Sequence, residues 1–288
     1  MTEISNVISN AISKSYTFHK ISQYSMKIKN IFFCHGGLQG LIVYLGAIKE
    51  LYKQRDKLDL HKLRIYGSSS GASLGLICLL VLNDIVDVDE LIVDTNRFFD
   101  RISNRFVFQF TQTCVELLET LWLKISDPRK VVSLANKHLY VGISQQTGFR
   151  YIQRFSNVPD ITHALLLSSN VVLLARYPAF DNKGVLTIDG GYMMTKHDLP
   201  RNCLVIYDEE SSLYECNIIP DYEKRGQLIS KGECYVKRII SSKQIYRIND
   251  KMFNNLSDSF IHFSFYLQKY VAIQDLSFTD RIKNIYNR

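Results

Sequence analysis

The first 82 residues alternate between short apolar runs that suit buried strands and longer apolar runs that suit helices. This pattern predicts a strand at residues 26–34, a helix at 41–52, a second strand at 63–66 and a second helix at 72–82. Strands that alternate with helices in this way form parallel sheets, since each helix returns the chain to the same end of the sheet. We therefore expect an α/β protein with a mainly parallel central sheet and helices on both of its faces.

The remaining sequence extends this pattern. Further strands are predicted at residues 140–143, 184–188 and 203–207, and a helix is predicted at residues 161–171. Residues 88–125 are amphipathic and are expected to form helices that cover the sheet. The chain thus supplies enough strands and helices for a large single α/β domain.

The chain divides into three parts without a Pro- or Gly-rich linker. Residues 1–27 are interpreted as an N-terminal amphipathic helical segment, and residues 28–210 as the α/β domain. Residues 211–288 are expected to be a C-terminal extension packed on the same domain, with its clearest helix at residues 260–273. With 46% hydrophobic and 22% charged residues, the composition is that of a globular protein.

Cysteine usage and apolar patterning point to a reduced compartment. The six cysteines are scattered and form no Cys-x-x-Cys motif or zinc-finger spacing. No apolar stretch reaches the roughly 18 residues that span a bilayer, and the N-terminus lacks the apolar region of a secretory signal. We expect a soluble cytoplasmic protein that needs no metal or other cofactor.

The formal net charge is +7, which favours anionic partners in general. The basic residues are spread thinly and form no long block, so solvated surface is the favoured reading and no nucleic-acid partner is expected. Together with the apolar faces of residues 1–12 and 260–273, the charge would suit peripheral contact with an anionic membrane.

The pentapeptide Gly67-Ser68-Ser69-Ser70-Gly71 lies between a predicted strand and a predicted helix. This is the setting of a nucleophile elbow, in which Ser69 projects its hydroxyl from a tight turn. The helix that follows offers free N–H groups and the positive end of its dipole, both of which favour the negative charge of acyl transfer. A Gly/Ser-rich turn without chemistry is the alternative, and other motifs must decide between the two.

Two further predicted strand ends carry polar or glycine-rich motifs. His35-Gly36-Gly37-Leu38-Gln39-Gly40 follows the first strand, and Asp189-Gly190-Gly191 follows the strand predicted at residues 184–188. Functional groups of parallel sheets gather at the carboxyl ends of the strands. The glycine turn and the serine turn are therefore expected at the same edge of the sheet.

With these three motifs in this order, the chain resembles the patatin-like phospholipase family over about residues 28–210. The resemblance implies a three-layer α/β/α fold, and a serine acyl hydrolase that cleaves phospholipids or other lipid esters without a metal. It implies a dyad of Ser69 as nucleophile and Asp189 as proton acceptor. The oxyanion hole would be formed by Gly36, Gly37 and Leu38, and the motifs would be supported by His35, Gln39, Gly40, Gly67, Gly71, Gly190 and Gly191.

The glycine turn departs from the family pattern at two positions. His35 stands where the family has its first glycine, and Gln39 stands where it has arginine or lysine. A Cβ at position 35 restricts φ, and Gln39 lacks the cation, although it can still donate hydrogen bonds. These departures keep open an alternative function, that of a catalytically weak or inactive relative that binds lipid or a protein.

A Ser-His-Asp triad of the α/β-hydrolase kind is the chemical alternative to the dyad. It requires a histidine downstream of Asp189, and only His197 and His262 qualify. His197 follows the aspartate by only eight residues, and His262 lies in a predicted apolar helix, where packing is the simpler role. The dyad is therefore the favoured interpretation.

Overall fold

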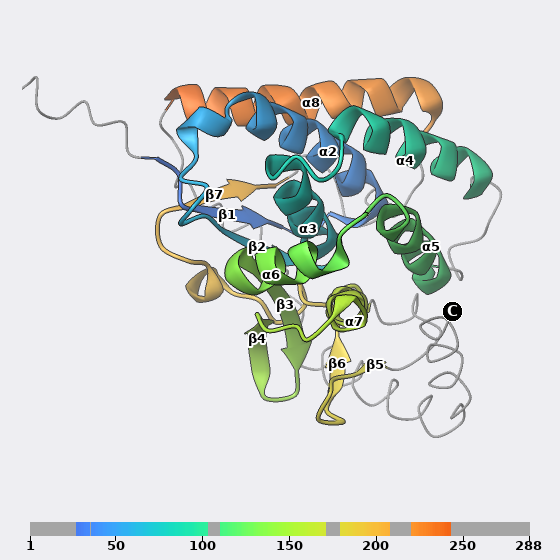
Figure 1. The fold of residues 1–288 in the computed structure, drawn as a ribbon, viewed down its shortest axis with the longest axis vertical. Helices are drawn as coiled ribbons and strands as arrows, with labels where there is room; N and C mark the ends of the chain where they lie inside the picture. Colours follow the sequence, from blue (N-terminus) through green and yellow to red (C-terminus); the bar gives the residue numbers. More distant parts are fainter. Residues whose placement is uncertain (1–26, 35, 103–109, 171–178, 208–219, 243–288) are drawn as a thin grey trace, which may run out of the picture.

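The structure of the chain is a computed structural model that describes residues 27–34, 36–102, 110–170, 179–207 and 220–242. Its centre is a seven-stranded sheet with the order β5-β6-β3-β2-β1-β7, and β4 pairs with β3 outside this path (Figure 1). The strands are β1 Asn30–Phe33, β2 Arg64–Ser68, β3 Leu139–Gln145, β4 Gly148–Ile152, β5 Ala179–Phe180, β6 Leu186–Ile188 and β7 Cys203–Ile206.

Strands β7, β1, β2 and β3 run parallel, whereas β4, β5 and β6 pair antiparallel. The register places Phe33 of β1 beside Gly67 of β2, so these two strands end at the same edge of the sheet. This confirms that the glycine turn and the serine turn lie at one edge. That edge, at the carboxyl ends of the parallel strands, is called the elbow edge below.

The helices are α2 Gly37–Lys53, α3 Ser70–Leu82, α4 Val88–Ile102, α5 Phe110–Trp122, α6 Pro128–His138, α7 Val158–Ser168 and α8 Tyr222–Ser242. Two 3-10 turns, η1 Arg55–Lys57 and η3 Lys196–Asp198, complete the described elements. The α/β class and the mainly parallel central sheet flanked by helices are confirmed.

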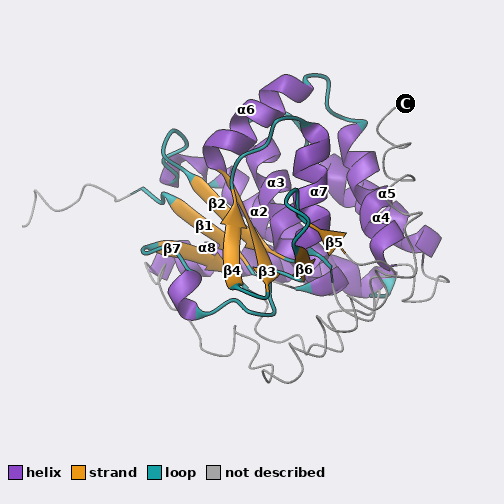
Figure 2. Cartoon of the chain, turned by 90° about the horizontal axis from the view of Figure 1, so that it is seen from below, coloured by secondary structure: helices purple, strands orange, loops and turns teal. Residues whose placement is uncertain are grey.

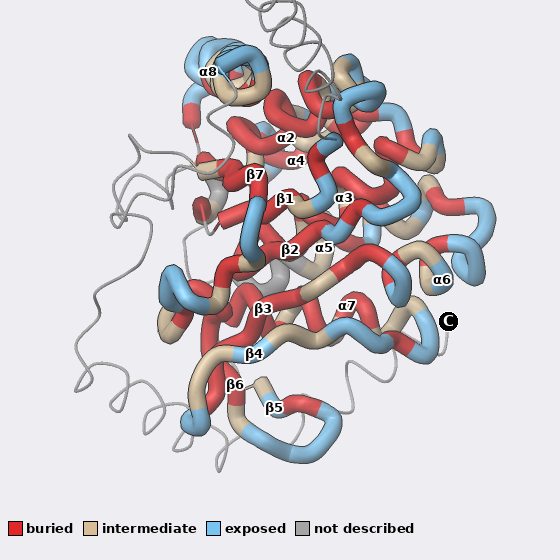
Figure 3. Tube along the Cα trace, turned by 90° about the vertical axis from the view of Figure 1, so that its left-hand side faces the viewer, coloured by how far each residue is buried: buried red, intermediate tan, exposed pale blue. Residues whose placement is uncertain are grey.

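One face of the sheet forms the main hydrophobic core with the helices. Ile31, Ile65 and Leu204 share this core with apolar residues of α2 to α8, and Figure 2 shows the helices gathered beside the strands. In Figure 3 the strands β1, β2, β3 and β7 and the helix α2 are largely buried, while β4 and α8 present exposed residues at the surface. Side chains of a strand alternate between the two faces of a sheet, so the residues next to these three point to the opposite face and need a separate cover.

The other face carries a smaller cluster around Phe32, Tyr66 and Val205. Met194 and Leu199 pack into it from the segment after β6, and rings of β4 pack against it. In the described ranges, no α-helix contributes to this second cluster. The sequence predicted helices on both faces; in the described part of the chain, β4 and a loop cover this one, because their aromatic and apolar side chains supply the needed contact.

The glycine-rich stretch differs from its expected form. The sequence predicts a turn up to Gly40 and a helix from residue 41, but α2 already begins at Gly37. The Gly40 amide donates to the Gly36 carbonyl oxygen at 2.7 Å, so these glycines form the first turn of the helix. The expected turn is therefore shorter than predicted.

Helix α8 is a finding that the sequence did not predict, and it packs directly on α2. A Cβ added at Gly46 of α2 would lie 2.0 Å from the Ile229 carbonyl oxygen of α8. A Cβ added at Gly232 of α8 would lie 1.8 Å from the Val43 carbonyl oxygen of α2. The two glycines allow the helix backbones to approach closely. No described helix is both long and apolar enough to cross a membrane. The helices predicted near the N-terminus and at residues 260–273 lie outside the described residues.

Candidate active site

The serine turn has the backbone geometry of a strained elbow. Ser69 lies between β2 and α3 with φ 57° and ψ −137°, a conformation that residues with a Cβ seldom adopt. A Cβ added at Gly67 would lie 2.3 Å from the Gly71 carbonyl oxygen. A Cβ added at Gly71 would lie 2.3 Å from the Phe33 carbonyl oxygen. Glycine is therefore required on both sides of the serine, because the end of β1 and the start of α3 press against the turn.

Ser168, the last residue of α7, holds this turn in place. Its hydroxyl accepts the Ser69 amide at 2.9 Å and donates to the Gly142 carbonyl oxygen of β3 at 2.6 Å. Both hydrogen bonds are buried, so they satisfy an amide of Ser69 and a carbonyl oxygen of Gly142 that water does not reach. The elbow is thereby tied to the neighbouring strand and to α7. In the sequence, Ser168 falls within the helix predicted at residues 161–171, and that pattern gives no sign of this role.

The same segment of α7 positions Asp189. The Asp189 amide donates to the Asn170 carbonyl oxygen at 2.9 Å, and the Gly190 amide donates to the Ser168 carbonyl oxygen at 2.8 Å. An added Cβ at Gly190 would lie 2.1 Å from the Gly142 carbonyl oxygen. Glycine thus lets the aspartate motif lie against β3, next to the strand that borders the elbow.

The Asp189 carboxyl group is almost fully buried, with 3% of the residue exposed. Its Oδ1 accepts the Gly191 amide at 2.8 Å, whereas Oδ2 has no hydrogen-bond partner among the residues that the structure describes. Burial raises its pKa to about 6, because the charged form loses its hydration, while the neighbouring Ser69 hydroxyl and the Gly191 amide act in the opposite direction. The group can therefore gain or lose a proton near neutral pH.

The glycine stretch begins beside Ser70. The Gly36 amide donates to the Ser70 hydroxyl at 3.2 Å, and Gly37 has φ 56°, a value that favours glycine. Leu38 is the second residue of α2, and Gln39 is buried. His35 lies outside the described residues.

Two helix N-termini meet at this point. Ser69 precedes α3 and Gly36 precedes α2, and no described side chain caps either helix at this end. The first N–H groups of a helix have no partner within the helix. The dipoles of the two helices add a positive potential at the elbow edge.

The space around Gly40 does not require a glycine. A Cβ added there would make only ordinary contact, 3.6 Å from the Tyr44 side chain.

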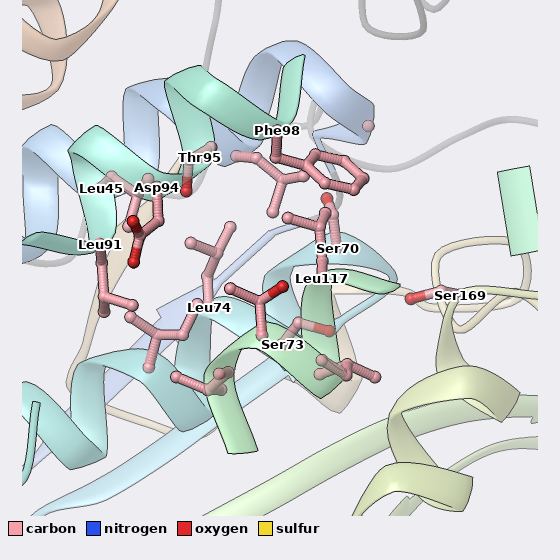
Figure 4. Close-up of a pocket in the computed structure, with 16 residues that line it drawn as sticks. Leu45, Ser70, Ser73, Leu74, Leu91, Asp94, Thr95, Phe98, Leu117 and Ser169 are labelled. Carbon is pink, nitrogen blue, oxygen red and sulfur yellow. The ribbon is translucent and has the colours of Figure 1, made fainter. Parts of the chain in front are cut away.

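An apolar pocket opens beside these groups, between α2, α3, α4 and α5. Gly37, Ser70 and Ser169 contribute to its wall, and most of the rest is leucine, isoleucine and phenylalanine. Figure 4 shows Ser70 and Ser169 toward one end and Leu91 and Asp94 toward the other. The sequence predicted helical cover for residues 88–125 but gave no sign of a pocket, since its lining comes from segments far apart in the chain.

The histidines do not join this arrangement in the part of the chain that the structure describes. His197 is exposed on η3, and its amide donates to the Thr195 hydroxyl; no hydrogen bond joins its ring to Ser69 or Asp189 among the described residues. His262 lies outside the described residues. In the described ranges, no group of three His, Cys, Asp or Glu side chains could hold a metal ion.

The fold and the site define an α/β protein with a serine elbow, a buried aspartate and a glycine-rich helix start at one edge of a parallel sheet. No protein-family model matches the chain, and no curated protein matches its sequence. Among solved structures, the chain is similar to VipD from Legionella pneumophila, with 14% identity and a TM-score of 0.43 over 75% of this chain and 67% of that one. It is also similar to the type III effector protein ExoU, with 12% identity and a TM-score of 0.35 over 90% of this chain and 62% of that one. These likenesses are too low to assign a family or an activity.

Proposed function

We propose that this protein is a serine acyl hydrolase that cleaves carboxylic esters of lipids, with Ser69 as nucleophile and Asp189 as proton acceptor. One observation carries the proposal. A serine in a strained strand-to-helix turn neighbours a buried aspartate whose Oδ2 has no hydrogen-bond partner in the described ranges of the chain. Burial of a carboxylate oxygen without a hydrogen bond lowers the stability of the folded protein. Such groups are found at functional sites, and acceptance of a proton from a serine is a function that fits this one.

In the proposed reaction, Asp189 takes the proton of the Ser69 hydroxyl as the serine oxygen attacks the ester carbonyl carbon. The tetrahedral intermediate then collapses, and the leaving alcohol receives that proton from Asp189. Water next gives a proton to Asp189 while its oxygen attacks the acyl-serine, and collapse of the second intermediate returns the proton to Ser69 and releases a carboxylic acid. Because Asp189 must be ionised to act, hydrolysis is expected to rise with pH through about 6.

The oxyanion is proposed to bind at the start of α2. The resemblance to patatin-like phospholipases implies that Gly36, Gly37 and Leu38 have this role. In the structure the Gly36 amide already donates to the Ser70 hydroxyl, so it could contribute only after that hydroxyl turns away. We therefore expect the amides of Gly37 and Leu38 to be the main donors, aided by the helix dipole.

The apolar pocket supports a lipid substrate rather than a polar ester. It adjoins Ser70 and Gly37, so an acyl chain could lie in it while its carbonyl group reaches Ser69. Each CH₂ group removed from water favours binding by about 0.8 kcal/mol. The motif resemblance to patatin-like phospholipases points to the same substrate class.

Hydrolysis of a medium-chain p-nitrophenyl ester tests this proposal. We expect Ser69→Ala and Asp189→Asn each to lower kcat/KM by about a thousandfold or more, and His197→Ala to change it less than about twofold. Thermal unfolding of each variant shows whether it is folded. If His197→Ala were as inactive as Ser69→Ala, the dyad would be wrong and a triad would replace it.

A non-catalytic lipid-binding protein is the second candidate. The observation that favours it is the Gly36 amide, which donates to Ser70 instead of being free for an oxyanion. Co-sedimentation with anionic vesicles at low salt separates the two candidates. A folded wild type that binds vesicles yet hydrolyses no ester favours the binding protein, whereas hydrolysis that depends on Ser69 favours the enzyme. Absence of vesicle binding would remove the peripheral membrane contact that the net charge suggests.

A further inference from the structure

A polar cleft lies at the opposite edge of the sheet, where β1 and β2 begin. Its walls come from the start of β1, from the turn before β2 and from the end of α6. β2 runs from Arg64 in the cleft to Ser68 beside the elbow, and five strand residues span about 15 Å. The cleft is therefore separate from the candidate active site.

Basic side chains dominate this cleft. Six of its eight lining residues are basic, the other two are Asn30 and Leu63, and no carboxylate is among them. The basic residues are Lys29, His61, Lys62, Arg64, Lys137 and His138. We call this surface the basic cleft. A concave surface lined by one sign of charge concentrates the electrostatic potential and attracts ions of the other sign.

The charges of the basic cleft are not balanced locally. Lys29, Lys62, Arg64 and Lys137 form no ion pair with any Asp or Glu of the described chain, whereas Lys124 pairs with Asp94 at 2.8 Å. The nearest acidic residue in sequence to Lys62 is Asp59, which accepts the Lys62 amide through its carbonyl oxygen. Its carboxylate does not line the cleft.

His138 supplies a buried and oriented group in the wall. Only 5% of the residue is exposed, and its Nδ1 lies 2.6 Å from the Leu63 carbonyl oxygen, so Nδ1 carries the proton and donates. With Nδ1 bonded in this way, Nε2 is the ring nitrogen left for a further hydrogen bond. Burial lowers the pKa of His138, and nearby Lys137 and His61 act in the same direction, whereas the hydrogen bond to the Leu63 carbonyl oxygen acts against them. An anion in the cleft would oppose these effects and favour the doubly protonated ring.

Helix geometry alone does not account for the cleft. Lys137 and His138 lie in the last turn of α6, where cations are favoured by the helix dipole. Lys29 lies just before β1, Lys62 lies in the turn before β2, and Arg64 is the first residue of β2, so none of them belongs to that helix. Their convergence with the helix end needs another explanation.

We propose that the basic cleft binds a phosphomonoester group. Such a group carries close to two negative charges and three acceptor oxygens, which matches several lysine and arginine donors that converge from three segments. The cleft is one compact hollow rather than a long basic stripe, so it suits a single phosphate better than a nucleic-acid backbone. A free phosphomonoester and a phosphomonoester lipid headgroup share this chemistry.

Calorimetric titration of the full chain with inorganic phosphate, at constant ionic strength set with chloride, tests the proposal. The test variant is Lys62→Gln with Lys137→Gln. The matched control removes two exposed lysines of α8, Lys224→Gln with Lys237→Gln. We expect saturable binding by the wild type, a loss of at least about tenfold in the test variant, and less than about twofold in the control. No saturable binding by the wild type, or equal loss in both variants, would overturn the proposal.

Vesicles distinguish the two sources of phosphate. Phosphatidylcholine vesicles are compared with vesicles that also contain phosphatidic acid, a phosphomonoester lipid, or phosphatidylserine, which is anionic without a phosphomonoester. Preference for phosphatidic acid that disappears in the test variant identifies a lipid headgroup, and binding of inorganic phosphate alone identifies a soluble ligand. Equal binding to both anionic vesicles, with no saturable phosphate binding, contradicts the proposed cleft. Unchanged unfolding midpoints of the variants show that the fold is intact.

Discussion

At the scale of single residues, the backbone conformation that positions the Ser69 hydroxyl lowers the stability of the folded protein. Ser69 has a positive φ, which costs a residue with a Cβ about 1–3 kcal/mol. Glycine adopts this conformation without that cost but loses more backbone entropy on folding. The strain is maintained by Ser168, whose hydroxyl accepts the Ser69 amide. A serine that is held in an unfavourable backbone conformation by its surroundings is expected to have a function.

The strain at Ser69 leads to a prediction about stability. Ser69→Gly should raise the free energy of unfolding by about 1 kcal/mol, because relief of the positive φ outweighs the entropy of glycine. Ser69→Ala keeps the Cβ and should not stabilise. Urea unfolding of both variants and the wild type measures this difference. Destabilisation by glycine would show that the turn is not strained.

The buried carboxyl group of Asp189 predicts a pH-dependent effect on stability. Its pKa is raised from 3.8 in the unfolded chain to about 6 in the folded protein. Between these values the folded state binds more protons, so this group's contribution to stability is full below about pH 4 and is lost as pH rises through about 6. Asp189→Asn should therefore stabilise the protein by up to about 3 kcal/mol above pH 7 and by little below pH 4.

Urea unfolding of wild type and Asp189→Asn at pH 4, 6 and 8 checks this. Asparagine can still accept the Gly191 amide through its side-chain oxygen, so the comparison mainly removes the charge. An equal difference at all three pH values would mean that the carboxyl group is not titrating in this range.

At the scale of secondary-structure elements, the packing of α8 on α2 depends on glycine. Gly232→Ala should destabilise the protein by more than about 2 kcal/mol, because its Cβ would lie 1.8 Å from the Val43 carbonyl oxygen and the helices would have to separate. Gly226→Ala in the same helix is the control, since an added Cβ there meets no atom of the described residues within 4 Å. Alanine favours a helix over glycine by about 1 kcal/mol, so the control should be neutral or stabilising.

Thermal unfolding of the two alanine variants measures the contrast. If both had the same midpoint, the close contact between α2 and α8 would not contribute to stability.

The elements themselves were predictable to different degrees. The strands and helices of the first 82 residues followed from apolar runs of the right length. α8 did not, because its buried side is narrow and consists mainly of Leu228, Gly232 and Val236 between many charged residues. Gly232 is buried for backbone contact rather than for its side chain, and hydrophobic patterning does not detect that.

At the scale of the whole molecule, the parallel sheet separates two candidate sites. The elbow edge gathers Ser69, Asp189 and the start of α2, while the basic cleft lies where β1 and β2 begin. The elbow motifs could be predicted because each is a short sequence at a strand end. The apolar pocket and the basic cleft could not, since each joins segments that only the tertiary fold brings together.

The apolar pocket makes a prediction about chain length. Leu91→Phe adds bulk at the end of the pocket that lies away from Ser70, so it should lower kcat/KM for decanoyl esters by about tenfold and leave butyryl esters nearly unchanged. Val93→Phe, on the exposed side of the same helix, is the control and should change neither. Hydrolysis of a p-nitrophenyl ester series measures this. Equal loss for short and long chains would place the acyl chain elsewhere.

The central claim is that Ser69 is an activated nucleophile, and labelling by a fluorophosphonate probe tests it most directly. Intact-mass spectrometry is applied to wild type, Ser69→Ala and Asp189→Asn, with folding checked by thermal unfolding. We predict a single adduct on the wild type, none on Ser69→Ala and much slower labelling of Asp189→Asn. A well-folded wild type that stays unlabelled, or a Ser69→Ala variant labelled as fast as the wild type, would contradict the account.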